Sequence, residues 1–561
     1  MYNYIKGLTL SIAVFIGLSA AAQKKQVAKF QQIINEAVKK AYPASVRMWG
    51  FDVQQQQRTS AQFSGVVVSA DGYILTAAHT IIPGKNYKVF FPDGRECIAI
   101  ALGKIENKDT PGIPDVGMMK ITDKGDWPHA EMGYSASLVK NEPCISISYP
   151  ETLNQTWPTL RLGNVAEVKN EYGFIRSTCK MEPGDSGGPL FDYHGRVIGL
   201  HSAIDVSEEM NFEIPVDLYR RYWTALNSEI LYTAFPKKTD SIKTDPLHSV
   251  IEKENKQKAL HPVFETLSLK NSCLLIASTV KGKIQEIEAT LFNVKMANGD
   301  KKQFLLSKNA MVGENVQLIN NGLAFPLVVL KRDKENDLAL LQTPEKLAGG
   351  VDLDVASGDA GKIETGRFLY TVEHDGKVVR SVLSSSIFNL PKINNIPYLG
   401  AMVVYNSIPV QFSLIKAGSP AEKAGIKVGD ELISINGKSL TKASEFAPEM
   451  LKYWADDELV FEWTSDSVKV RKSIKLGERI QPAFNHPAEK FKGGKSERRD
   501  GFNHVFAHDA AIKASACGSP VFDWEGNFYG INIARFSRTT TLVVPKNILL
   551  KSVLNWLKSG N

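Results

Sequence analysis

From about Ala44 to Ile214 the sequence consists of short β-branched runs separated by Gly, Pro, Asn and Asp residues. This pattern is typical of an all-β barrel or sandwich. Two strands are expected over 65–69 and 73–77, joined by an Asp-Gly turn at 71–72. A docking helix before the first strand, with apolar residues at helical spacing and Pro43 as its stop, and a helical segment near 216–232 are expected to flank this unit.

A serine and a histidine lie in sequence settings that suit nucleophilic catalysis. The chain reads GDSGGP over 184–189 and TAAH over 76–79. Glycines on both sides of Ser186 allow a sharp backbone turn, and the N–H groups of Gly184 and Ser186 are then available to a developing oxyanion. The turn therefore predicts a serine nucleophile with its oxyanion hole.

A serine is a weak nucleophile at neutral pH, so it needs a base and a carboxylate that orients the base. The candidates are His79 and Asp115, the latter opening the apolar run DVGMMKI. The chain order His, Asp, Ser is that of the chymotrypsin fold. A single buried His or Asp is usually structural, and GDSGGP alone persists in inactive relatives. The three residues in this order predict a triad of His79, Asp115 and Ser186.

Composition excludes several other classes of protein. The length of 561 residues suggests three or four domains. The net charge of +7 is small for this length and no dense Lys/Arg block is present, so nucleic-acid binding is not expected. Five cysteines are too few, and odd in number, for a disulfide scaffold, although one bridge inside the first domain stays open. No spacing suggests a metal site, and no cofactor is expected.

The first 22 residues have the pattern of a secretory signal peptide: Lys6, an apolar stretch from Leu8 to Leu18, and small residues at 20–22. Cleavage is expected before Gln23. The apolar run is short for a membrane-spanning helix, and no stable membrane anchor is expected. The sequence therefore predicts a secreted or periplasmic protein.

The runs SGVVVSADGYILTAAHT, DVGMMKI, GDSGGPLFDYHGRVIGLHSAI and NFEIPVDL resemble the HtrA-like trypsin-type serine proteases over nearly all of 44–232. The resemblance implies two six-stranded β-barrels with the triad in the cleft between them, unfolded or exposed polypeptides as substrates, and a role in protein quality control. Residues 200–204 are then expected to line the pocket for the substrate side chain. No acidic residue is evident there, which favours small or aliphatic side chains. Oligomerisation stays open.

The block SPAEKAGIKVGDELISINGKSL at 419–440 looks like a PDZ domain of the type that HtrA proteases carry. Upstream, YLGA at 398–401 resembles the loop that receives the C-terminal carboxylate of a peptide in such domains. The expected peptide-binding residues are Tyr398, Leu399, Gly400 and Ala401. A peptide C-terminus would add as a strand beside 401–405.

Segments on both sides of this block echo the first domain. ACGSPVFDWEGNFYGINIAR at 516–535 repeats the pattern of DSGGPLFDYHGRVIGLHSAI at 185–204, which sets Cys517 opposite Ser186. NDLALLQTP sets Asp337 opposite Asp115, and the histidine position holds Ala310, or Asn309 after a slip of one. Ser515 replaces the oxyanion-hole glycine. This second copy is expected to be a degenerate trypsin-like domain, with Cys517 buried and inert rather than nucleophilic.

The expected fold is mainly β: a chymotrypsin-like double β-barrel followed by a second, degenerate double β-barrel that an inserted PDZ domain interrupts. The domain boundaries are a signal peptide at 1–22, a trypsin-like serine protease domain at 23–232, a linker at 233–262, a degenerate domain at 263–396 and 481–561, and a PDZ domain at 397–480.

The expected function is that of a serine endopeptidase with PDZ-mediated peptide binding. Two alternatives stay open: a non-catalytic peptide-binding adaptor, and a latent protease that needs an activating partner. The complete set of triad residues argues against the first, because drift to inactivity would normally erode at least one of them.

Overall fold

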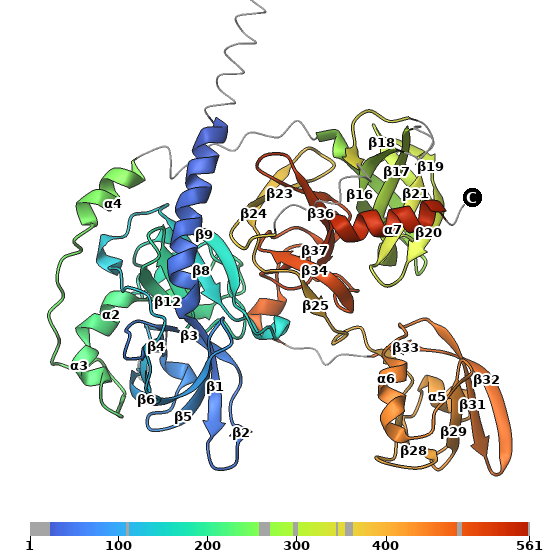
Figure 1. Cartoon of the computed structure of the whole chain (residues 1–561), viewed down its shortest axis with the longest axis horizontal. Coiled ribbons are helices and arrows are strands. Elements are labelled where there is room, and N and C mark those ends of the chain that lie inside the picture. The colour runs from blue at the N-terminus through green and yellow to red at the C-terminus, as the bar shows by residue number, and fades with distance from the viewer. Residues whose placement is uncertain are drawn as a thin grey trace, which may run out of the picture. The chain divides into compact units, whose positions relative to one another are not determined.

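The computed structural model describes residues 23–558, apart from 108–111, 257–269, 296–300, 344–345, 354–362 and 480–484. The expected signal peptide at 1–22 lies outside the described residues. The chain divides into two compact units (Figure 1). The first contains residues up to 388 with 486–495 and 504–561, and the second contains 389–485 with 496–503.

The first six-stranded ring of the first unit is built from antiparallel strands. Its strands are β1 (Ser45–Asp52), β3 (Phe63–Val67), β4 (Tyr73–Ala77), β5 (Asn86–Phe90), β6 (Glu96–Ile105) and β7 (Val116–Ile121), with β2 (Gln57–Arg58) paired to β1. The ring closes because β6 pairs with both β5 and β7. Alternate residues such as Val46, Met48 and Val89 fill its interior, as the period of two in a half-buried strand requires.

The second ring is a closed barrel of β8 (Pro143–Ser148), β9 (Thr159–Glu167), β10 (Ile175–Ser177), β11 (Pro189–Asp192), β12 (Val197–Ile204) and β13 (Asn211–Pro215). The predicted pair of six-stranded barrels is therefore confirmed. We call these two rings the first barrel pair. After them, α2 (Val216–Arg221) and α3 (Trp223–Leu226) replace the single helical segment expected near 216–232, and β14 (Leu231–Tyr232) returns beside β6.

Two further segments pack on this pair. Residues 23–41 form the expected docking helix, and its buried residues Phe30, Ile34 and Ala37 face the barrels. The polar segment after 232 contains α4 (His248–Asn255). Before α4, the buried carboxylate of Asp245 accepts hydrogen bonds from the guanidinium of Arg196 at 3.0 and 3.3 Å. This ion pair fastens the segment to the barrel.

The rest of the first unit contains two more sheets with the same strand orders, which we call the second barrel pair. The first sheet comprises β15 (Cys273–Val280), β16 (Lys283–Lys295), β17 (Lys301–Lys308), β18 (Glu314–Asn320), β19 (Leu323–Pro326), β20 (Val328–Asp333), β21 (Leu338–Gln342) and β22 (Val351–Leu353). Strands β19 and β20 flank Leu327 and pair with β18 and β21, as the two halves of β6 pair with β5 and β7. They close the ring in the same way.

The second sheet of this pair comprises β23 (Phe368–Val372), β24 (Val378–Val382), β25 (Phe388–Leu390), β34 (Phe502–His508), β35 (Pro520–Asp523), β36 (Phe528–Arg535) and β37 (Thr541–Pro545), followed by α7 (Lys546–Lys558). Its order β24-β23-β35-β36-β37-β34 matches β9-β8-β11-β12-β13-β10 of the first pair. The Ser384 N–H donates to the Ala507 oxygen at 2.8 Å between the two ends. The second unit of the chain is inserted between β25 and β34, at the position of the β9–β10 loop.

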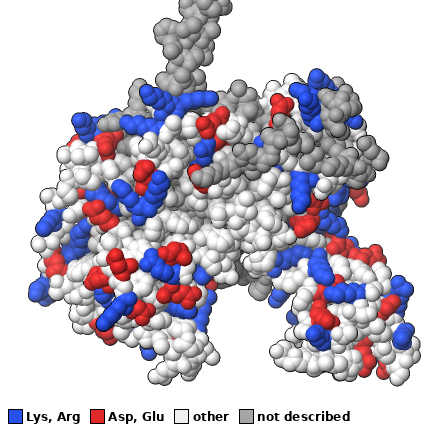
Figure 2. All heavy atoms as spheres, in the orientation of Figure 1, with Lys and Arg blue, Asp and Glu red and all other residues white. Residues whose placement is uncertain are grey.

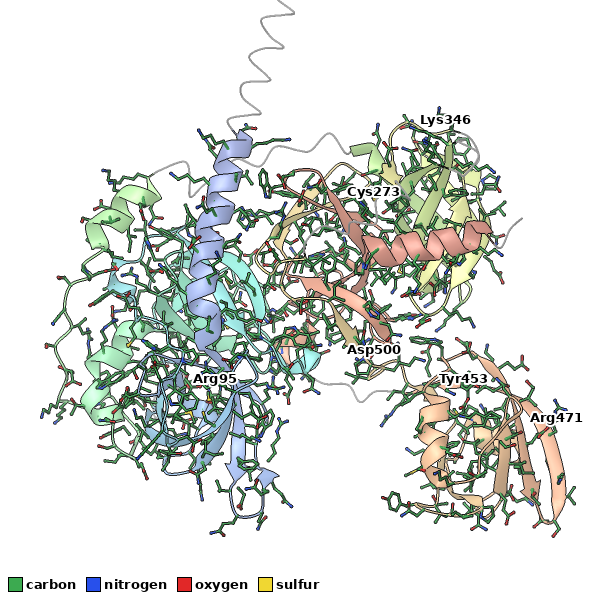
Figure 3. All side chains as sticks on the ribbon, in the orientation of Figure 1. Arg95, Cys273, Lys346, Tyr453, Arg471 and Asp500 are labelled. Carbon is green, nitrogen blue, oxygen red and sulfur yellow. The ribbon has the colours of Figure 1, made fainter. Side chains whose placement is uncertain are left out.

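The second unit is a small sheet of β27 (Ala401–Val403), β28 (Val410–Ile415), β29 (Glu431–Ile435), β30 (Lys438–Ser439), β31 (Glu458–Ser465) and β32 (Val468–Lys475), with α5 (Pro420–Ala424), α6 (Phe446–Met450), β26 (Pro397–Tyr398) and β33 (Gly477–Glu478). Phe412, Phe461 and Trp463 form its core. The buried carboxylate of Asp500 accepts hydrogen bonds from the backbone N–H groups of 393–395. Asp500, labelled in Figure 3, thereby joins the segment 496–503 to the first residues of this unit.

Short 3-10 turns complete the described elements: Tyr42–Ala44, Ala78–Thr80, Ser135–Ser137, Glu151–Leu153, Lys270–Ser272, Asn309–Met311, Ala443–Glu445, Pro487–Glu489 and Ala514–Ala516. Acidic and basic side chains are interspersed on the face shown in Figure 2, so no single-sign patch dominates it. Within the described residues, no helix has the length and apolar character needed to cross a membrane.

Candidate active site

The candidate base and its carboxylate are joined directly. His79 lies in the 3-10 turn that follows β4, and Asp115 lies directly before β7, which pairs with β4. The Oδ2 atom of Asp115 is 2.8 Å from Nδ1 of His79 and accepts the His79 backbone N–H at 2.9 Å. The two contacts fix the imidazole plane, with Nε2 left as the free ring nitrogen.

The other carboxylate oxygen of Asp115 is held from the second barrel. The Ser202 hydroxyl, on β12, donates to Oδ1 of Asp115 at 2.6 Å. Asp115 therefore receives donors from both barrels of the pair, and its orientation depends on their packing. Sequence reasoning placed Ser202 only in the run 200–204 and missed this contact.

The two groups shift each other's pKa. Burial disfavours the charged imidazole, but the hydrogen bond and charge of Asp115 outweigh it, and the pKa of His79 is raised above its ordinary 6.5. Burial likewise opposes the charged carboxylate, but the hydrogen bond from His79 holds the pKa of Asp115 below its ordinary value. The pair is thus tuned to stabilise a proton on His79.

The serine turn lies between β10 and β11, with Gly184 at φ +97°. Among the described residues, the N–H groups of Gly184 and Ser186 donate to no acceptor. Ser64 on β3 holds the turn, because its N–H donates to the Ser186 oxygen at 2.9 Å and its hydroxyl to the Gly184 oxygen at 2.8 Å. Two unpaired N–H donors, two residues apart on a turn held in this way, can bind an oxyanion.

Glycine at 184 is required by space as well as by its positive φ. An added Cβ would lie 2.4 Å from the Glu151 nitrogen and 2.6 Å from the Tyr149 oxygen. Both contacts are with backbone, which cannot move aside as a flexible side chain can. Any other residue at this position must therefore change the turn.

A buried ion pair supports the turn from below. Arg161 on β9 donates to Asp185 at 2.8 Å, and both side chains are almost fully buried. The same carboxylate accepts the Glu182 N–H at 2.9 Å and the Ser148 hydroxyl at 2.8 Å. The sequence indicated a turn and packing role for Asp185. It contained no signal for Arg161, because Arg161 lies on β9 and Asp185 lies in a turn 24 residues later.

The Ser186 hydroxyl forms no hydrogen bond with His79 or with any other described residue. The structure thus brings His79 and Asp115 into contact and prepares the turn around Ser186, but the serine and the base are not joined. In substrate-free sites such hydrogen bonds are often long and tighten only in the complex.

Not all residues of 200–204 face the expected pocket. His201 is fully buried and its Nε2 lies 2.6 Å from the Ser146 hydroxyl, so this ring points into the barrel. Burial lowers the pKa of His201 to about 3. Beside the pocket, Lys180 is paired with Glu208 of the following loop. Glu208 lies outside the run 200–204, in which no acidic residue was evident.

All five cysteines are buried and unbridged. The sulfurs of Cys144 and Cys179 lie 4.0 Å apart inside the second barrel, so the bridge left open by the sequence is not formed. No cluster of three or more His, Cys, Asp or Glu side chains that could hold a metal occurs in the described part of the chain.

The second barrel pair repeats the backbone of this site. Ala310 N–H donates to Asp337 at 2.8 Å, as His79 N–H donates to Asp115. Gly518 N–H donates to the Asn532 oxygen at 2.7 Å, as Gly187 N–H donates to the His201 oxygen. These contacts put Ala310, not Asn309, in the histidine position and Cys517 in the serine position.

The side chains of that second site differ from those of the first. The Nζ atom of Lys308 donates to Oδ2 of Asp337 at 2.6 Å. Residues Ala514–Ala516 form a 3-10 turn in which the Cys517 N–H donates to the Ala514 oxygen at 3.2 Å. A 3-10 turn replaces the positive-φ backbone of Gly184 because Ser515 disfavours that conformation. The donor that an oxyanion would need is therefore taken.

The YLGA loop of the second unit has the features of a carboxylate-binding loop. The N–H groups of Leu399 and Gly400 donate to no described acceptor, and Gly400 has φ +77°. The Gly400 oxygen accepts the Lys416 N–H at 2.8 Å, which fixes the loop. Strand β27, which follows, is an edge strand of its sheet. An extended peptide can add to such an edge.

Comparison with known proteins gives two family matches. Residues 63–200 match the trypsin-like peptidase domain, and residues 411–450 match the PDZ domain. A putative serine protease, HhoB, of Synechocystis is 32% identical over 161 residues, which are 27% of this chain and 37% of the relative. The chain is HtrA-like: it combines a trypsin-like peptidase domain with a PDZ domain.

Two further similarities belong beside these. A probable periplasmic serine endoprotease, DegP-like, of Hahella chejuensis is 25% identical over 402 residues, which are 70% of this chain and 75% of the relative. The HtrA-type protease AlgW with a decapeptide is 15% identical, with a TM-score of 0.29, over 80% of this chain and 99% of that structure. The HtrA-like chain thus spans about a third of the Synechocystis relative and three quarters of the Hahella relative.

Proposed function

We propose that this HtrA-like chain is a serine endopeptidase. The observation that carries the proposal is the 2.8 Å contact between His79 and Asp115 beside a glycine turn with two unpaired N–H groups. In the proposed reaction the Ser186 hydroxyl attacks a peptide carbonyl while His79 takes its proton, and His79 later protonates the leaving amine. Asp115 keeps the imidazole in the useful tautomer and stabilises its charged form.

As Ser186 bonds to the carbonyl carbon, the π-bond electrons pass to the carbonyl oxygen, and the resulting oxyanion is bound by the N–H groups of Gly184 and Ser186. Because these donors are already oriented by Ser64, they need no reorganisation as the charge develops. Arg161 and Asp185 do not touch the reacting atoms. They position the turn.

The PDZ domain is proposed to bind peptide C-termini through residues 398–401. The free carboxylate would accept the N–H groups of Leu399 and Gly400, and the peptide backbone would pair with the β27 edge. Exposed apolar side chains on and beside that strand, Met402 and Val404, would contact the peptide.

The second barrel pair is proposed to be a pseudo-protease domain over 263–396 and 481–561, interrupted by the PDZ domain at 397–480. Two observations support this. The backbone contacts of the first site are repeated, and Ala310 and Cys517 stand at the histidine and serine positions while Lys308 binds the carboxylate. We also propose a periplasmic or secreted location after removal of residues 1–22, unfolded polypeptides as substrates, and a role in protein quality control, since relatives bear the description of periplasmic endoproteases.

A latent protease is the second candidate. The observation that favours it is the absence of a hydrogen bond from Ser186 to His79. The test is hydrolysis of an unfolded protein such as casein by the chain from Gln23 onward, with Ser186→Ala as the control. Hydrolysis without any added peptide supports the constitutive endopeptidase. Hydrolysis only after addition of a peptide with a free C-terminus supports latency, and none under either condition rejects both.

A further inference from the structure

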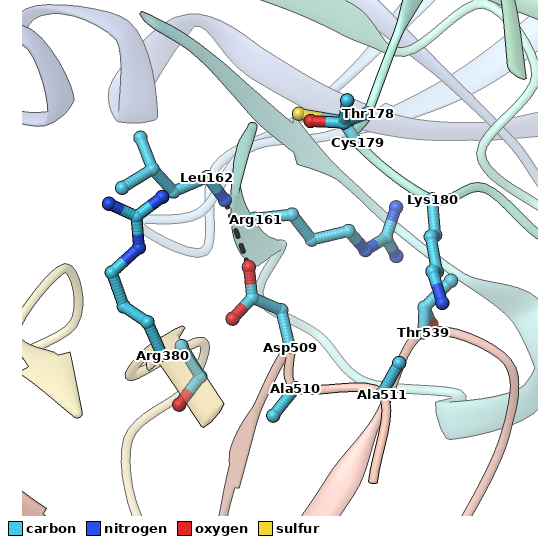
Figure 4. Close-up of a pocket in the computed structure, with 11 residues that line it drawn as sticks. Arg161, Leu162, Thr178, Cys179, Lys180, Arg380, Asp509, Ala510, Ala511 and Thr539 are labelled. Atoms are coloured by element: carbon cyan, nitrogen blue, oxygen red, sulfur yellow. Dashed lines mark hydrogen bonds between the residues drawn. The ribbon is translucent and has the colours of Figure 1, made fainter. Parts of the chain in front are cut away.

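The two barrel pairs meet through equivalent elements. The Leu160 N–H on β9 donates to the Ser384 oxygen at 3.1 Å, directly after β24, which is the counterpart of β9. The Leu162 N–H donates to the Asp509 carboxylate at 3.0 Å (Figure 4). Contacts between equivalent surfaces are the rule in two-fold symmetric dimers. The catalytic pair and its degenerate copy therefore resemble a dimer within one chain.

A cavity of about 170 Å³ lies at this contact. Its lining comes from both pairs in matching positions, with Thr178, Cys179 and Lys180 after β10 and with Asp509, Ala510 and Ala511 after β34 (Figure 4). The first of these segments leads into the serine turn. The second barrel pair therefore borders the segment that leads to Ser186.

The equivalent turns after β12 and β36 also meet. Arg538, in the turn between β36 and β37, is fully buried. Its guanidinium donates to the oxygen of Asp205 at 3.0 Å and to the oxygen of Ser207 at 3.0 Å. These residues belong to the loop that follows β12, the strand that supplies Ser202 and the expected pocket wall.

Within that loop the Asp205 N–H donates to the Met210 oxygen and the Met210 N–H to the Ser207 oxygen, both at 3.1 Å, but its side chains pack little. The side chains of Asp205, Val206 and Ser207 are all exposed. Two charge-assisted hydrogen bonds from one planar guanidinium fix both the position and the direction of a short backbone segment. Arg538 is therefore a major restraint on the loop.

The same copy also reaches the other side of the pocket. Thr539, in the same turn as Arg538, lines the cavity together with Lys180. The Lys492 N–H donates to Glu208 at 2.5 Å, and Glu208 is the partner of Lys180. Lys180 and the loop at 205–208, which border the expected pocket, are thus both in contact with the second barrel pair.

We propose that the turn at 536–540 of the second barrel pair is a positioning element that sets the substrate side-chain pocket and the oxyanion turn of the first pair. Arg538 is its principal positioning residue. The inference rests on the proposed endopeptidase function and gives the degenerate copy a role in it: the copy shapes specificity and transition-state binding without touching substrate.

The test compares Arg538→Ala and Arg538→Lys in the full chain from Gln23 onward. The matched control is Arg332→Ala, since Arg332 lies on β20 and donates within its own barrel pair, to Asn309, Val312 and Gly313. Three quantities are measured for each variant: the rate of Ser186 labelling by a fluorophosphonate, kcat and KM for peptides that differ only in the side chain before the cleaved bond, and amide hydrogen exchange over 203–210.

Arg538→Ala is expected to slow labelling and to lower kcat/KM about 10- to 100-fold, because small misplacements of a preorganised site have costs of this size. It should also flatten the preference among the peptides and speed exchange over 203–210. Arg538→Lys should recover part of each effect, because an ammonium group can still donate to the carbonyls. Arg332→Ala should match the wild type in all three.

Equal labelling, preference and exchange in Arg538→Ala and Arg332→Ala would overturn the inference. The exchange measurement separates it from the proposed function. If the wild type is not labelled but Arg538→Ala still frees 203–210, the endopeptidase proposal fails and the restraint stands. If Arg538→Ala does not fold, Arg538→Lys and Arg538→Gln carry the same comparison with smaller changes in volume.

Discussion

Lys308 Nζ lies 2.6 Å from Oδ2 of Asp337, at the place where His79 binds Asp115 in the first barrel pair. Both side chains are almost fully buried, and the lysine also donates to the Ile533 oxygen at 2.7 Å. Ile533 occupies the position of Ser202. One ammonium group thus stands where the first barrel pair has two side-chain donors to the carboxylate, His79 and Ser202.

Loss of this ammonium should destabilise the second barrel pair. Lys308→Met leaves the buried Asp337 charge without its cation, which typically costs about 3–5 kcal/mol. Chemical denaturation of the full chain should report the loss as a lower unfolding midpoint. Lys301→Met is the matched control, because Lys301 is an exposed residue on the same strand. Equal midpoints for the two variants would contradict the assignment.

The pH dependence of hydrolysis should reflect the raised pKa of His79. A general base works when it is neutral, so kcat/KM should rise with pH through a midpoint above 6.5. Asp115→Asn removes the charge that raises this pKa. The midpoint should then move to lower pH, while kcat falls about 10⁴-fold because the imidazole loses its orientation. A midpoint that does not respond to Asp115→Asn would show that His79 is not the titrating base.

Gly184→Ala should remove the oxyanion hole. The added Cβ would overlap the Glu151 nitrogen at 2.4 Å and the required φ of +97° is strained for alanine. Loss of one oxyanion donor lowers kcat by about 10²- to 10³-fold. Gly94→Ala is the matched control, since Gly94 has φ +89° but nothing lies within 4 Å of its Cβ position. Similar kcat values for the two variants would argue against the assigned donors.

Gly400→Ala should weaken binding of peptide C-termini to the PDZ domain. The new Cβ would lie 2.2 Å from Cβ of Ser419, so the loop must shift its N–H groups. Fluorescence anisotropy with a labelled peptide is expected to show a Kd about tenfold higher or more, equal to about 1.4 kcal/mol. Gly437→Ala is the control in the same unit, with φ +78° and open space. A peptide with an amidated C-terminus should bind neither variant nor the wild type tightly.

Much of the fold could be predicted because local sequence patterns specify its strands and turns. Alternating apolar residues and turn-forming Gly and Asp residues mark the strands of the first barrel pair. The repeated pattern around Cys517 revealed the second pair even though Ala310 and Ser515 had replaced the residues of the chemistry. His79, Asp115 and Ser186 could be named because each lies in a short motif.

The remaining features depend on pairing across long sequence separations, which single motifs do not encode. Arg161, Ser202 and Lys308 lie on strands, and each meets a carboxylate in or beside a turn elsewhere in the chain. The contact of Arg538 with the loop at 205–207 joins residues more than three hundred positions apart. Such partners follow from the packing of the sheets, and only the structure reveals them.

The most direct test of the central claim is fluorophosphonate labelling of the chain from Gln23 onward, followed by mass-spectrometric mapping of the adduct. The expected result is one adduct on Ser186 that disappears in Ser186→Ala and in His79→Ala, with Cys517 unmodified. A folded chain that takes up no label at Ser186, or that is labelled equally after His79→Ala, would contradict a serine activated by His79.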